Sequence, residues 1–119
     1  MDIRPKTLFI DIDGTLVKHA PPASSAHIEY QPQILPGTLN KLMEWDAKGY
    51  NIILVTGRRE SMRKVTEDQL RGLGIFYDQL IMGIGGGPRI LINDKKPGGE
   101  LAAFSINVDR DLGIKNLDL

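Results

Sequence analysis

The chain of 119 residues contains no cysteine. This absence excludes a disulfide framework and cysteine-ligated zinc, and it fits a reducing compartment. Neither charge is in excess, because 15 Lys and Arg balance 15 Asp and Glu, so we expect no nucleic-acid partner held by bulk charge. The sequence also lacks an apolar run of membrane-spanning length, and its start, MDIRPK, lacks the apolar core of a signal peptide. We therefore expect a cytoplasmic protein with no membrane partner.

The order of apolar segments predicts one domain, residues 1–119, in which strands and helices alternate. We expect strands at residues 7–10, 50–55, 80–82, 89–92 and 102–108, and helices at 36–48 and 61–73. Residues 18–35 are rich in Pro, Ser and Ala, and we expect a flap there with a short hairpin around 27–30. This order predicts an α/β, Rossmann-like fold of three layers, with a mainly parallel central sheet and helices on both faces.

Two acidic residues end the first predicted strand, within TLFIDIDGTLV. Asp11 and Asp13 are two residues apart, so continued strand geometry would point them the same way, and their charges would repel. A bound cation or a shared proton would offset that repulsion. The predicted strand at 89–92 also ends in an acid, Asp94, and parallel strands bring their carboxyl ends to one edge of a sheet. Carboxylates gathered at such an edge suit Mg²⁺.

Three segments in this order resemble motifs of the haloacid-dehalogenase (HAD) superfamily of phosphohydrolases. IDIDGTL at 10–16 is similar to the first motif, VTGR at 55–58 to the second, and LINDKKP at 91–97 to the acidic fourth. The resemblance implies a HAD-like fold without a cap domain, because the intervals between motifs leave room only for a flap. The GPRILINDKKP stretch and the small size are most similar to short phosphatase-like proteins of sugar-phosphate and surface-polysaccharide biosynthesis.

The resemblance also implies a mechanism. Asp11 would attack phosphorus to form an aspartyl-phosphate, and Asp13 would protonate the leaving oxygen and then deprotonate the attacking water. Mg²⁺ would lie between Asp11, the backbone carbonyl of Asp13 and Asp94. The residues expected to bind phosphate or shape its site are Gly14, Thr56, Gly57 and Arg58.

The lysine of the third HAD motif has no clear equivalent, because Gly83 is followed by Ile84. A cation besides Mg²⁺ is still needed beside the transferring phosphoryl group. Lys96 is our first choice, since it lies just beyond Asp94 and precedes a proline that favours extended backbone. Arg89 is the second choice on its place in the motif order.

These residues predict a Mg²⁺-dependent phosphomonoester hydrolase that acts on a sugar phosphate or similar small metabolite. An open site admits water, so we also expect a possible homo-oligomer. One alternative is a non-catalytic binding or scaffold protein with the same fold. A receiver-like phosphoacceptor module is less favoured, because no lone aspartate ends the strand at Leu54 or Met82.

Overall fold

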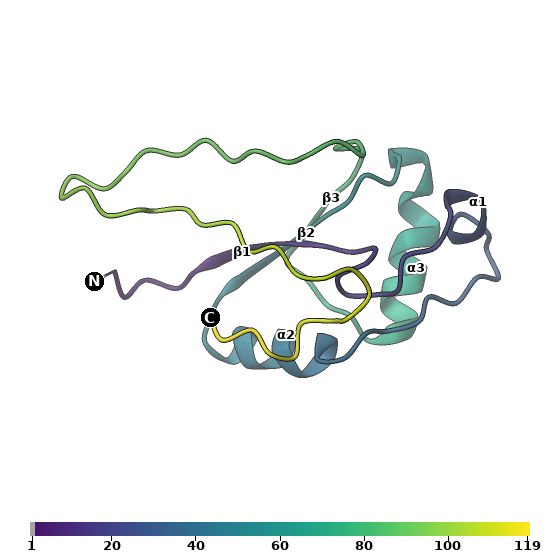
Figure 1. Ribbon diagram of the computed structural model, residues 1–119. Helices are drawn as coiled ribbons and strands as arrows, with labels where there is room; N and C mark the ends of the chain where they lie inside the picture. Colours follow the sequence, from purple (N-terminus) through teal and green to yellow (C-terminus); the bar gives the residue numbers. More distant parts are fainter. Residues whose placement is uncertain (1) are drawn as a thin grey trace.

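The computed structural model describes residues 2–119 and shows an α/β fold built on a three-stranded parallel sheet (Figure 1). The elements are β1 (Thr7–Asp11), α1 (Pro22–Ser25), α2 (Thr38–Ala47), β2 (Asn51–Val55), the 3-10 helix η1 (Glu60–Met62), α3 (Arg63–Leu73) and β3 (Gln79–Ile81). The strands lie in the order β1-β2-β3, and Asp11 at the end of β1 is in register with Val55 at the end of β2. The predicted first three strands and two main helices are thus confirmed, with boundaries shifted by one to two residues.

The hydrophobic core lies on one face of the sheet. Ile52 and Leu54 of β2 point to that face, because they are two residues apart in a strand. They share one buried cluster with Leu42 and Trp45 of α2 and with Leu70 of α3. Both long helices therefore pack on the same side, and Trp45 is a core residue.

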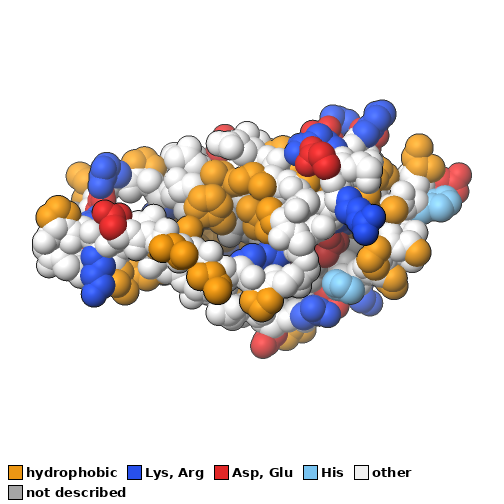
Figure 2. Space-filling model, turned by 90° about the horizontal axis from the view of Figure 1, so that it is seen from above, with side chains coloured by type: hydrophobic (Ala, Val, Ile, Leu, Met, Phe, Trp, Pro, Cys, Tyr) orange, Lys and Arg blue, Asp and Glu red, His pale blue; other side chains and the backbone are white. Residues whose placement is uncertain are grey.

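The opposite face of the sheet is partly open. Phe9 of β1 is 55% exposed and Ile81 of β3 is 39% exposed. Figure 2, seen from above the view of Figure 1, shows hydrophobic side chains gathered in the middle of the molecule. The expectation of helices on both faces is not met within residues 2–119, because the chain forms no helix after β3.

The strands expected at 89–92 and 102–108 are not formed. After β3 the chain leaves the sheet through Gly83 and Gly85, whose φ angles of 74° and 83° favour glycine. It then runs out and back as two extended arms, the green and yellow-green segments of Figure 1. Apolar composition predicted buried strands there, but a strand needs a neighbour to accept its hydrogen bonds. Ile90 and Ile92 are accordingly 84% and 91% exposed.

Two smaller expectations are also corrected. Residues 18–35 contain the short helix α1 in place of a hairpin, and the two ends of this segment meet through a bridge between Val17 and Ile34. The helix expected from residue 61 begins two residues later, because Ser61 lies inside η1 and α3 starts after Met62. Gly74 ends α3 with a φ of 76°. Among residues 2–119 no helix is long and apolar enough to cross a membrane.

Candidate active site

The two aspartates lie on a tight turn that follows β1. Asp11 is the last residue of the strand, and the N–H groups of Gly14 and Leu16 close the turn by donating to the carbonyls of Val17 and Ile12, at 2.7 and 2.9 Å. Gly14 has a φ of 89°, which a residue with a side chain rarely adopts. The turn therefore fixes both carboxylates at the carboxyl end of the sheet, where the sequence places them.

Asp11 is half-buried and has two polar neighbours. The hydroxyl of Thr15 donates a hydrogen bond to its Oδ2 at 3.3 Å, and Nη2 of Arg89 lies 3.6 Å from its Oδ1. Burial raises the pKa of the Asp11 carboxyl, and the negative charge of Asp13 acts in the same direction. Arg89 and Thr15 oppose this effect only in part. The group is thus a partly desolvated carboxylate with a cation beside it.

Asp13 is held by Arg58 from the segment after β2. Nε and Nη2 of Arg58 donate to its two carboxylate oxygens at 2.9 and 2.7 Å. Nη1 of Arg58 donates to Thr66 at 3.1 Å and to Gln69 at 2.7 Å, both on α3. These bonds satisfy a nearly buried guanidinium, as a buried charge requires. The expectation that Arg58 binds phosphate is corrected, because its donors are directed to these three side chains.

Thr56 and Gly57 lie beneath the glycine-rich loop at 83–87. Thr56 is 1% exposed, and its hydroxyl accepts a hydrogen bond from the N–H of Arg58 at 3.1 Å. A Cβ atom on Gly57 would lie 2.6 Å from the carbonyl oxygen of Gly85, so only glycine allows this approach. The N–H of Gly83 donates to the carbonyl of Arg58 at 2.7 Å. The loop therefore covers Thr56 and Gly57, which the sequence predicts to bind phosphate or shape its site.

Asp94 and Lys96 lie apart from the other predicted site residues. Asp94 is exposed on the first extended arm, where its carboxylate accepts from the neighbouring Asn93 amide at 3.4 Å. Lys96 forms an ion pair with Asp2 near the N-terminus. Because the arm does not pair with the sheet, it does not deliver these residues to the sheet edge. The structure brings Arg89 to Asp11 instead.

This arrangement does not form the expected magnesium centre. Among the residues described, no group of three His, Cys, Asp or Glu side chains converges in a way that could hold a metal ion. Of the three expected ligands, Asp11 and Asp13 share one turn and Asp94 does not approach them. Asp13 was expected to offer its backbone carbonyl, and its carboxylate accepts two hydrogen bonds from Arg58, so this side chain does not replace Asp94 as a ligand. The carboxylates in these positions therefore do not fit a preformed Mg²⁺ site.

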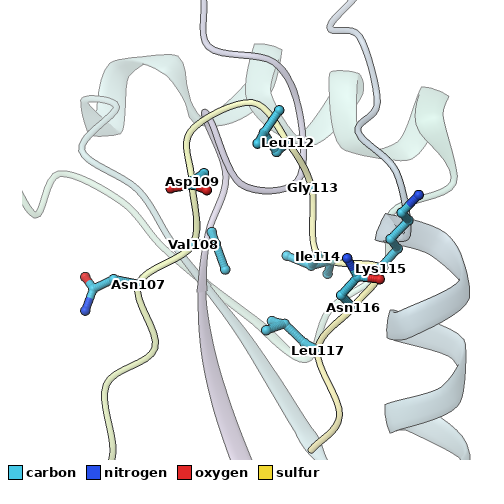
Figure 3. A pocket seen from close by; sticks show the side chains of 9 residues that line it. All are labelled: Asn107, Val108, Asp109, Leu112, Gly113, Ile114, Lys115, Asn116 and Leu117. Atoms are coloured by element: carbon cyan, nitrogen blue, oxygen red, sulfur yellow. The ribbon is translucent and has the colours of Figure 1, made fainter.

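The C-terminal segment reaches the site, and no motif in the sequence indicates this contact. The N–H of Asp111 donates to the carbonyl of Gly14 at 2.9 Å, so residues 109–114 lie against the turn that holds the aspartates. Figure 3 shows this segment arching beside a hollow of about 280 Å³ that residues 107–109 and 112–117 line, without Asp11 or Asp13. The sequence held one signal for the arch, Gly113, whose φ is 84°.

The fold and site thus define an α/β protein with a half-buried carboxylate at the end of its first strand. One similar solved structure is a chain of a Pnkp1/Rnl/Hen1 complex, with a TM-score of 0.58 and 29% identity over 72% of this chain and 30% of that one. Another is the crystal structure of a Vibrio cholerae protein, with a TM-score of 0.53 and 19% identity over 74% of this chain and 79% of that one. This chain therefore spans less than a third of the first structure. No protein-family model and no curated protein matches it.

Proposed function

We propose that the protein is a HAD-type phosphomonoester hydrolase in which Asp11 is the nucleophile. The observation that carries this proposal is the position of Arg89, which lies 3.6 Å from a half-buried Asp11 at the carboxyl end of β1. A phosphate monoester that approaches Asp11 would bring its negative charge next to this guanidinium. Preorganised positive charge at that point stabilises the charge that develops in phosphoryl transfer.

The reaction follows from the two carboxylates. An Asp11 oxygen attacks phosphorus, the P–O bond to the alcohol breaks, and an aspartyl-phosphate forms. Asp13 gives a proton to the departing alcohol oxygen and takes one from the water that attacks phosphorus in the second step. Inorganic phosphate then leaves and the Asp11 carboxylate is restored.

Arg58 has a positioning role in this scheme. Both oxygens of Asp13 accept from its guanidinium, so Asp13 must release one of those bonds when it carries a proton. The remaining hydrogen bond from Arg58 would keep the carboxyl group of Asp13 oriented. Arg58 thus links Asp13 to Thr66 and Gln69 on α3.

Dependence on Mg²⁺ remains a prediction from the sequence. Asp11, Asp13 and Asp94 do not converge, and no step above is assigned to the ion. A small phosphorylated substrate, such as a sugar phosphate, is likewise proposed from the sequence resemblance. The similar chain in the Pnkp1/Rnl/Hen1 complex supports the fold.

The deciding experiment is a screen of the purified protein against a panel of phosphate monoesters. Release of inorganic phosphate is measured with Mg²⁺ and then with EDTA, for the wild type and for Asp11→Asn. We expect turnover that Asp11→Asn abolishes, because an amide does not attack phosphorus. Asp13→Asn should trap the aspartyl-phosphate when the ester has an activated leaving group. Wild-type turnover by Asp11→Asn would refute the proposal.

The scaffold alternative draws on two observations. Asp94 stays apart from Asp11, and both oxygens of Asp13 are already hydrogen-bonded. A protein that uses this arrangement only for structure would hydrolyse nothing in the panel, with or without Mg²⁺. Steady turnover excludes this alternative.

A further inference from the structure

The C-terminal segment is fixed to the turn that carries the two aspartates. Asp111 bonds twice, through its N–H to the carbonyl of Gly14 at 2.9 Å and through its carboxylate, which accepts from the N–H of His19 at 2.8 Å. Three residues further on, the N–H of Ile114 donates to the carbonyl of Pro36 at 3.0 Å. Ile114 is 2% exposed, so the segment is anchored in the core as well.

Two glycines fix this segment in register. A Cβ atom on Gly113 would lie 2.3 Å from the carbonyl oxygen of Pro36, and one on Gly37 would lie 2.3 Å from Cα of Lys115. Each approach is possible only without a side chain. The segment is therefore held at one defined position against the loop that precedes α2.

Arg110 is the residue that this anchoring places beside the turn. Its Cγ lies 3.3 Å from the position of a Cβ on Gly14, and its Cδ and Nε both lie 3.9 Å from it. The stem thus packs on the turn while the residue as a whole is exposed. Within residues 2–119, its guanidinium takes part in none of the ion pairs.

The charges around Arg110 leave it able to bind an anion. Asp111 is occupied by the N–H of His19. Asp109 is next to Arg110 in the chain and is exposed. Solvent and salt therefore screen its attraction to the guanidinium. Arg89 and Arg58 already compensate Asp11 and Asp13. The positive charge of Arg110 is therefore not needed to compensate Asp11 or Asp13.

We propose that Arg110 binds a second anionic group of the substrate, a carboxylate or another phosphate, on the part that leaves as the alcohol. This inference rests on the proposed function. The transferring phosphoryl group has Arg89 beside Asp11, whereas the stem of Arg110 packs against Gly14, three residues further along the turn. A guanidinium binds either anion through two parallel hydrogen bonds. The substrate class is thus a phosphate monoester with a further negative group.

The test uses two substrates that differ at one end. Glycerol 3-phosphate ends in a neutral alcohol, and 3-phosphoglycerate carries a carboxylate on the same three-carbon skeleton. We expect the wild type to prefer 3-phosphoglycerate. Arg110→Gln keeps the aliphatic stem on Gly14, and it should lower kcat/KM for 3-phosphoglycerate by about tenfold or more, mainly through KM, because a charge-assisted hydrogen bond is lost. For glycerol 3-phosphate the change should stay within about twofold.

Lys115→Gln is the matched control, since it removes an exposed charge from the same segment. It should leave both substrates unaffected, and Arg110→Lys should restore part of the preference. Equal losses on the two substrates would overturn the proposal, because they would indicate a structural effect. Unchanged kcat/KM for 3-phosphoglycerate in Arg110→Gln would also overturn it.

Direct binding separates this proposal from the proposed function. Isothermal titration calorimetry with both compounds is carried out on Asp11→Asn, alone and combined with Arg110→Gln. Selective loss of 3-phosphoglycerate binding supports the role of Arg110 even where no variant hydrolyses a phosphate. Equal affinity with and without Arg110, or no binding of 3-phosphoglycerate to Asp11→Asn, would refute it.

Discussion

Arg58 and Asp13 form a two-bond ion pair across 45 residues of sequence, and Arg58 is only 9% exposed. Removing one partner of such a pair leaves an uncompensated charge. We expect Arg58→Ala to lower the free energy of unfolding by about 3 kcal/mol or more. Urea unfolding followed by the fluorescence of Trp45, the single buried tryptophan, measures this. Arg59→Ala, at an exposed neighbour, should change it by less than about 0.5 kcal/mol.

Asp11 makes a second prediction, about pH. Burial raises its pKa, so the folded protein holds this proton more tightly than the unfolded chain. As pH rises between the unfolded and folded pKa values, the unfolded chain loses the proton first, and stability falls. Asparagine carries no charge, so Asp11→Asn should raise Tm at pH 7 in metal-free buffer. The increase should disappear below the ordinary pKa of an aspartate.

Thermal unfolding at pH 7 and at acidic pH checks this sign. Asp46→Asn, at an exposed position on α2, should give no such pH-dependent increase. A lower Tm for Asp11→Asn at both pH values would show that the carboxylate stabilises the fold, against the expected direction.

The sequence predicted what local pattern determines. A continuous apolar run followed by Asp11, Asp13 and Gly14 specifies a strand and a tight turn, and both are found. The strand was expected to be buried on both faces, but it is only partly buried, and Phe9 is 55% exposed. The pairing of Asp13 with Arg58 depends on side chains far apart in sequence, and no local period encodes it. The contact of Arg110 with Gly14 could not be predicted either, because these residues are also far apart in sequence.

The extended arms show where local composition gave a wrong prediction. Residues 89–92 have the composition of a buried strand, yet composition does not specify which strand pairs with them. The position of Asp94 depends entirely on that pairing. The acidic residue was therefore predicted at the sheet edge, whereas the structure has it exposed on an arm.

The positions of the two candidate cations favour Arg89 over Lys96 for the proposed catalytic role, and this gives a third prediction. Arg89 lies 3.6 Å from Asp11, while Lys96 is paired with Asp2. We expect Arg89→Ala to lower kcat by about a hundredfold, as loss of a donor at developing charge does. Lys96→Ala should leave kcat unchanged, as measured by phosphate release. A larger loss from Lys96→Ala would restore the assignment made from the sequence.

A fourth prediction concerns the close contact between Gly57 and the loop at 83–87. A Cβ atom at position 57 would lie 2.6 Å from the carbonyl of Gly85. Gly57→Ala should therefore displace the loop and cost about 1–3 kcal/mol of stability. Gly72→Ala is the matched control, because nothing lies within 4 Å of its Cβ position in α3. That change should stabilise the protein by about 0.5–1 kcal/mol. Equal effects of the two substitutions would contradict the close packing.

The extended arms give the last prediction. Their exposed apolar side chains are Ile90, Leu91, Ile92, Leu101, Phe104 and Ile106. Exposed apolar segments with unpaired backbone promote association between chains. We expect the mass measured by light scattering to rise with protein concentration, in line with the possible homo-oligomer. Ile90→Ser combined with Ile92→Ser should lower that mass, and Ile28→Ser, at an equally exposed position outside the arms, should not.

Hydrogen exchange at residues 89–92 distinguishes the ways in which the arms could be covered. Amide protection that grows with concentration supports association through the arms. A monomer with fully exchanging amides at 89–92 would contradict the prediction. A monomer in which these amides are protected at every concentration would also contradict it, and would show that the arm pairs within its own chain. Pairing along β1 would bring Asp94 to the edge that carries Asp11, because parallel strands end together. In that case the three carboxylates would converge, and titration with Mg²⁺ should raise Tm in the wild type but not in Asp94→Asn.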